Sequence, residues 1–118
     1  MKLQIEAQHL RIRVDEDELA QLLAGNVVAG HTQFATAFMM QVTLRLQHAV
    51  EPVLTGCADA WQIGLPEVAV REHAARLPSR DGLRYLLRGE RDVDALTLLF
   101  DVDVRDSVRR RRGQSPEG

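Results

Sequence analysis

The fold is decided by the opening stretch MKLQIEAQHLRIRVDEDELAQLLAG, residues 1–25. Its first half alternates between polar and apolar side chains, and this period of two predicts half-buried β-strands. A short link at residues 7–9 separates two such runs and indicates a hairpin, although it lacks the Asn-Gly or Asp-Gly pair of a tight turn. The side chains expected to share one face are Leu3, Ile5, Leu10, Ile12 and Val14.

A helix is predicted directly after this strand pair. Asp15 can cap its first turn, and Glu18 follows at the spacing of a capping box, with aspartate in place of serine or threonine. Leu19, Leu22 and Leu23 form an apolar stripe at helical spacing. Gly25 then provides a C-terminal stop.

The rest of the chain continues with the same two patterns. The predicted order is ββαββ-(β)βαββ, which defines an α+β fold with a mainly antiparallel sheet and two helices, the sheet being either open or barrel-like. The repeated order is what a diverged duplication would give, but alternating patterns also resemble one another without common origin, and both explanations stay open. Strands are predicted at 27–34, 37–47, 83–88 and 96–104, with one or two more within 53–65, and the second helix at 66–77, with Pro66 as its first residue and an apolar stripe of Val70, Ala74 and Leu77.

Length and composition fit one folded domain. The 118 residues are 45% apolar and 27% charged, as in globular proteins, and we assign residues 1–108 to a single domain. Four consecutive arginines, Arg109–Arg112, open a segment without apolar residues, so 109–118 is predicted to be a disordered basic tail. The formal net charge of −2 argues against a general nucleic-acid binder.

Cysteine content and hydropathy indicate the cellular compartment in which the protein is expected. The single cysteine excludes an internal disulfide and favours a reducing environment. The N-terminus has no continuous apolar run of the kind found in signal peptides, and no stretch approaches the roughly 18 apolar residues of a membrane span. We therefore expect a cytoplasmic protein that has no contact with a membrane.

The residue types that carry catalysis are not grouped in any known pattern. The four histidines lack the paired spacing of a zinc site, so we expect no metal and take the histidines as exposed or locally bonded. Cys57 has no positive neighbour to activate it and is expected to be a buried structural cysteine. Serine motifs and glycine-rich phosphate loops are absent from the sequence. These features favour a protein that is not an enzyme and that uses no cofactor.

Two groups of outward side chains remain as candidates for function. The arginines of the polar sheet face, Arg11, Arg13, Arg45 and Arg84, form either cross-strand ion pairs or a cradle for an anion. Met39, Leu86 and Leu99 fall on the nominally polar faces of their strands. They predict an apolar patch that either forms a homodimer surface or is covered by a loop.

The opening strand pair, Leu3-Gln-Ile-Glu and Leu10-Arg-Ile-Arg-Val14, followed at once by Asp-Glu-Asp-Glu-Leu, resembles a family of short uncharacterised bacterial proteins. That family opens with a similar pair of strands joined by a Gly-Asn-Ser turn and followed by a capped helix. Here Ala7-Gln8-His9 replaces the turn. The resemblance implies a small domain of this strand and helix order. It implies no activity and no site residues.

The sequence therefore predicts a small, non-enzymatic binding or protein-interaction module that self-associates through an apolar patch or a sheet edge. The alternative is a protein that binds an anionic metabolite, or a small enzyme, using the arginine and aspartate face with His31 or His48 nearby. Association with nucleic acid through the basic tail is a third, less favoured hypothesis.

Overall fold

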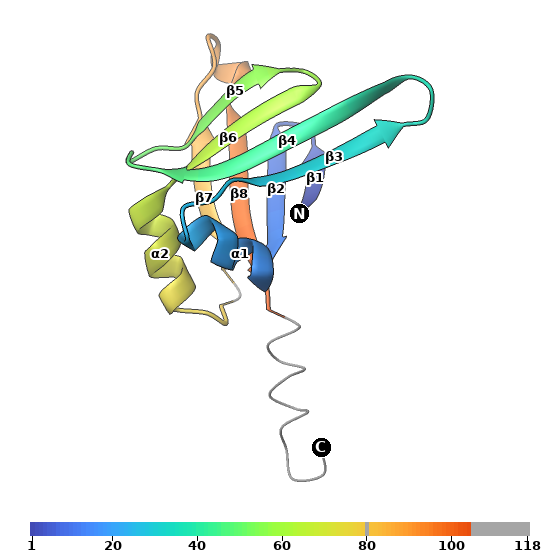
Figure 1. Ribbon diagram of the computed structural model, residues 1–118. Coiled ribbons are helices and arrows are strands. Elements are labelled where there is room, and N and C mark those ends of the chain that lie inside the picture. The colour runs from blue at the N-terminus through green and yellow to red at the C-terminus, as the bar shows by residue number, and fades with distance from the viewer. Residues whose placement is uncertain (80, 105–118) are drawn as a thin grey trace.

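The computed structural model describes residues 1–79 and 81–104, which form two four-stranded β-sheets packed face to face, with both helices at one end (Figure 1). The tail predicted at 109–118 lies outside the described residues. The strands are β1 (Lys2–Glu6), β2 (His9–Asp15), β3 (Val28–Phe34), β4 (Phe38–Gln47), β5 (Val53–Cys57), β6 (Ala60–Pro66), β7 (Leu83–Leu87) and β8 (Leu96–Asp103); the helices are α1 (Glu16–Leu23) and α2 (Glu67–Ala75), with a 3-10 turn η1 (Asp92–Asp94).

Each sheet is mixed, with a parallel pair at its centre and an antiparallel hairpin strand on each side. One sheet has the order β1-β2-β8-β7 and is called the β2/β8 sheet; the other has the order β3-β4-β6-β5 and is called the β4/β6 sheet. The parallel pairs are β2 with β8 and β4 with β6. The predicted α+β class, the two helices and the strand-rich order are confirmed, and the sheets are open rather than closed into a barrel.

The two halves of the chain have the same topology. The first half, β1 to β4 with α1, contributes one hairpin to each sheet, and so does the second half, β5 to β8 with α2. The register repeats as well: Lys2 pairs with Arg13, and Val53 pairs with Gly64, 51 residues further along both strands. If each strand is replaced by its counterpart in the other half of the chain, the strand order of one sheet becomes that of the other. The ββαββ repeat predicted from the sequence is present in the topology and in the register.

The core lies between the sheets and is filled by the alternating apolar positions. Helix α1 covers one end with Leu19 and Leu22, and α2 covers the same end with Val70 and His73. Burying these side chains removes apolar surface from water, at about 25 cal/mol per Å². The strands contribute Leu10, Ile12, Val14, Val28, Val42, Leu44, Ile63, Leu65, Leu98, Phe100 and Val102 to the buried core.

The helix ends show how closely local sequence fixes local structure. The Asp15 side chain accepts a hydrogen bond from the Glu18 backbone N–H at 2.7 Å, and the Glu18 side chain accepts one from the Asp15 N–H at 3.0 Å. This is the predicted capping box, and Gly25 follows with a left-handed φ of 88°. Helix α2 differs from its prediction. Pro66 is the N-cap residue, not the first helical residue, and the helix ends at Ala75, two residues before the predicted end at Leu77.

Replacing Asp15 with alanine should destabilise the domain by roughly 0.5–2 kcal/mol, because the Glu18 backbone N–H at the start of α1 loses its partner. Urea unfolding followed by circular dichroism measures the loss. Asp17→Ala is the matched control, since it removes the same charge from the exposed first turn without removing a cap. Equal losses for the two variants would contradict the capping role.

Candidate functional site

The outer face of the β2/β8 sheet carries a cluster of ion-paired arginines. The Asp101 carboxylate accepts hydrogen bonds from the Nε atoms of Arg11 and Arg13, each at 3.0 Å. The Asp101 side chain is only 13% exposed because the two guanidinium groups cover it. Such a cluster is a cross-strand pairing, in which each pair contributes roughly 0.2–1 kcal/mol. Arg11 and Arg13 are therefore already engaged by a carboxylate of their own sheet.

The four arginines considered as an anion cradle do not converge. Arg84 lies on β7, on the same outer face as Arg11, with Leu99 directly between them in the register. Arg45 lies on the outer face of the β4/β6 sheet, opposite Gly64. Three of the four thus share a face, and Arg45 is on the opposite side of the sandwich.

Three of the four histidines lie on the surface, as expected. His9 begins β2 and His31 lies in the middle of β3, both exposed; the Nδ1 atom of the exposed His48 lies 3.2 Å from a carboxylate oxygen of Glu67. The expectation is wrong for His73, which is only 3% exposed. His73 is the equivalent of Leu22 in the repeat and fills the same place beneath its helix, so helix-face position, not polarity, determines its burial.

Burial is the main cause that lowers the pKa of His73 below its ordinary value of 6.5, because the charged imidazolium is disfavoured away from water. The nearby guanidinium of Arg76 lowers the pKa further, and the carboxylate of Asp101 opposes the shift. The neutral ring is therefore the form that the folded domain favours.

Cys57 is exposed, and the buried position expected for it is wrong. It is the last residue of β5, an edge strand whose residues are all exposed, so alternation does not bury it. Its Sγ donates to the Asp59 carboxylate at 3.1 Å.

The three outward apolar residues do not form one patch. Leu86 and Leu99 lie on the outer face of the β2/β8 sheet, whereas Met39 lies near the far end of β4 in the other sheet. Leu99 is only partly exposed because it lies between Arg11 and Arg84. Leu86 and Met39 are 57% and 47% exposed.

Strand β3 is the longest of the four edge strands. It is seven residues long, whereas the edges β1, β5 and β7 have five each. Its sequence, VAGHTQF, contains no acidic residue, no lysine or arginine and no proline, and every residue from His31 to Phe34 is exposed. Charged residues interrupt β1 and β7, and Gly56 gives β5 a left-handed φ of 101°. Natural edges usually carry charge, proline or irregular backbone that blocks pairing with another strand, and β3 has none of these.

The β3–β4 hairpin extends beyond the rest of its sheet. Strand β6 pairs with β4 only from Gln41 onward, so residues 32–40, which we call the arm, have no neighbour in the β4/β6 sheet except each other. Figure 1 shows the arm reaching past the other strands. At its tip the rings of Phe34 and Phe38 stack with centroids 4.9 Å apart and remain 43% and 51% exposed. The alternation within 37–47 puts Phe38 on the same strand face as Val42 and Leu44 and so predicts that it is buried. It is exposed because the opposite sheet does not reach the tip.

Strand 27–34 is predicted correctly, and the absence of acidic residues, lysine and arginine along it is visible in the sequence. This absence indicates an unprotected edge only once the strand order places β3 at the edge of its sheet. The extension of the arm has no local signal, since it depends on where β6 begins to pair with β4.

No protein-family model matches the chain, and no curated protein is significantly similar to it in sequence. The resemblance to a family of short bacterial proteins is thus untested. Within residues 1–79 and 81–104, no cluster of three or more histidine, cysteine or acidic residues is arranged to hold a metal ion. In the same part of the chain, neither helix has the length and hydropathy needed to cross a membrane.

The buried His73 predicts a loss of stability in mild acid. Since its pKa is lower in the folded state, the unfolded chain binds the extra proton first. The stabilising contribution of the neutral ring is complete above about pH 6.5 and is lost as the pH falls through the pKa that His73 has in the folded state. His73→Leu, which copies Leu22 of the other half, should reduce the fall in urea midpoint between pH 7.5 and 5. Exposed His31→Gln is the control and should keep the wild-type pH profile; if His73→Leu also keeps it, the assignment is wrong.

Proposed function

We propose that this chain is a small, non-enzymatic interaction module that self-associates, and that its interface is the exposed edge of β3 together with the arm. The observation that carries the proposal is the seven-residue, uncharged edge of β3. A strand edge presents unpaired N–H and C=O groups, and a second strand satisfies them by forming a further ladder.

A second copy of the chain is the partner that best fits this edge. Antiparallel pairing about a two-fold axis at His31 matches all seven residues of β3 with those of its copy, and brings Phe34 of each chain beside Val28 of the other. Because the strand contains no lysine, arginine, aspartate or glutamate, the pairing brings no like charges of these residues together. The stacked Phe34 and Phe38 rings then gain cover from the second chain.

The arrangement of the arginines gives less support to an enzyme or an anion-binding site than β3 gives to self-association. Asp101 already engages Arg11 and Arg13, and Arg45 lies on the other sheet. The single exposed cysteine is compatible with a reducing compartment, and we place the module in the cytoplasm on that basis.

The dimer is tested by placing a charge at the centre of the proposed axis. His31→Lys puts two ammonium groups opposite each other, so the dissociation constant of the dimer should rise at least roughly tenfold. Sedimentation velocity between micromolar and millimolar concentrations measures the equilibrium, with circular dichroism to confirm that the variant is folded. Hydrogen exchange should show protection of β3 amides that increases with wild-type concentration.

Leu86→Lys is the matched control, because Leu86 is exposed on a different edge strand and the same lysine is introduced there. It should dimerise like the wild type. A wild-type chain that stays monomeric at millimolar concentration contradicts the proposal. Dissociation by Leu86→Lys but not by His31→Lys would move the interface to the outer face of the β2/β8 sheet.

A further inference from the structure

The two sheets border an open cavity at the end of the sandwich opposite the helices. Its volume is about 370 Å³, and it is bounded by strands of both sheets close to their hairpin turns. At the other end α1 and α2 cover the core with apolar side chains, whereas neither of them reaches this end (Figure 1). The volume is in the range of roughly 300–1,000 Å³ typical of small-molecule sites.

The position of the cavity follows from the internal repeat. Ile5 pairs with Leu10 across the first hairpin, and Gly56 pairs with Trp61 at the equivalent place in the third. All four residues line the cavity, so it spans the axis that relates the halves. The two halves differ at this place, because the first half has Ile5 where the second half has Gly56. Gly56 has a φ of 101°, and a Cβ at this position would meet the Ala60 carbonyl oxygen.

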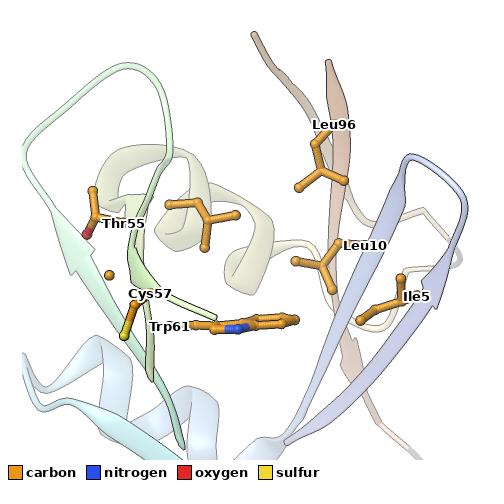
Figure 2. Close-up of a pocket in the computed structure, with 8 residues that line it drawn as sticks. Ile5, Leu10, Thr55, Cys57, Trp61 and Leu96 are labelled. Atoms are coloured by element: carbon orange, nitrogen blue, oxygen red, sulfur yellow. The ribbon is translucent and has the colours of Figure 1, made fainter. Parts of the chain in front are cut away.

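Trp61 provides a flat wall for this space. Figure 2 shows its indole extending from β6 toward Leu10 and Ile5, with Leu96 on the far side of the cavity. The indole Nε1 donates to the Ala58 carbonyl oxygen at 2.7 Å, which satisfies the polar edge of the ring and holds its orientation. The ring face that borders the cavity is then available for stacking.

The lining determines the chemistry of an occupant. Among the residues that the structure describes, no charged side chain borders the cavity, and the polar side chains on its β5 side are Thr55 and Cys57. Figure 2 shows the Thr55 hydroxyl directed away from the space above Trp61. An ion placed here would lose hydration without gaining a partner, which is costly. The cavity is open to solvent, and Ile5 is 63% exposed at its rim.

From these observations we infer that the cavity is a binding site for a small, neutral, flat apolar molecule that stacks on Trp61. This site is separate from the β3 edge, and its existence does not depend on self-association.

The chain contains one tryptophan, so its fluorescence reports on this cavity directly. Titration with the neutral probe N-phenyl-1-naphthylamine should quench Trp61 emission by energy transfer and saturate at one probe per chain. An anionic naphthalene sulfonate of similar size should bind at least tenfold more weakly. The lone thiol gives a second reading, since bound probe should slow the labelling of Cys57 by N-ethylmaleimide.

Ile5→Lys brings an ammonium group to the rim at an exposed position and should weaken binding of the neutral probe at least tenfold. Leu86→Lys, on an outer sheet face, should bind like the wild type. Absence of saturable quenching, equal binding of the anionic probe, or equal binding by Ile5→Lys would overturn the inference. So would Trp61 emission that changes with protein concentration alone and is restored by His31→Lys, because a second chain would then occupy the cavity.

Discussion

The backbone ladder between β2 and β8 joins strands that are 88 residues apart in the chain, and the rest of the structure depends on it and on its counterpart between β4 and β6. Neither half of the chain can form either sheet alone, because each supplies one hairpin to each sheet. An isolated hairpin has marginal stability in water. The inward residues gain cover only after both ladders have formed, so the two sheets and the core are mutually dependent.

Local patterns in the sequence predicted the elements well because they depend on neighbours in the chain. The alternation of Leu10, Ile12 and Val14 places them inward, and the Asp15 capping box begins α1 as expected. The parallel pairs were not predicted, since pairing between β2 and β8 leaves no local signal. The same limit explains the errors at Phe38 and Cys57. Alternation identifies which face of a strand a residue occupies, but whether that face is covered depends on the opposite sheet.

The functional features were less predictable than the fold for the same reason. The arginines were correctly identified as outward, but the strand order decides that Arg45 is separated from the others. The lack of charge in VAGHTQF was visible in the sequence, and it acquires meaning only because β3 is an edge strand. The cavity depends on the register that puts Gly56 and Trp61 opposite Ile5 and Leu10, and no pattern within one strand indicates it.

The differences between the halves are concentrated where function is proposed. Equivalent core positions hold similar residues, as with Ile12 and Ile63, and both are buried. By contrast, β3 continues to Phe34 and turns tightly into β4, whereas its counterpart β7 ends at Leu87 and a longer connection with η1 follows. At the open end, indole replaces leucine and glycine replaces isoleucine. Packing constrains both halves alike, because each must cover the same core. Departures from the repeat at exposed positions are free of that constraint, and here they produce an unprotected edge in one half and an apolar cavity between the two.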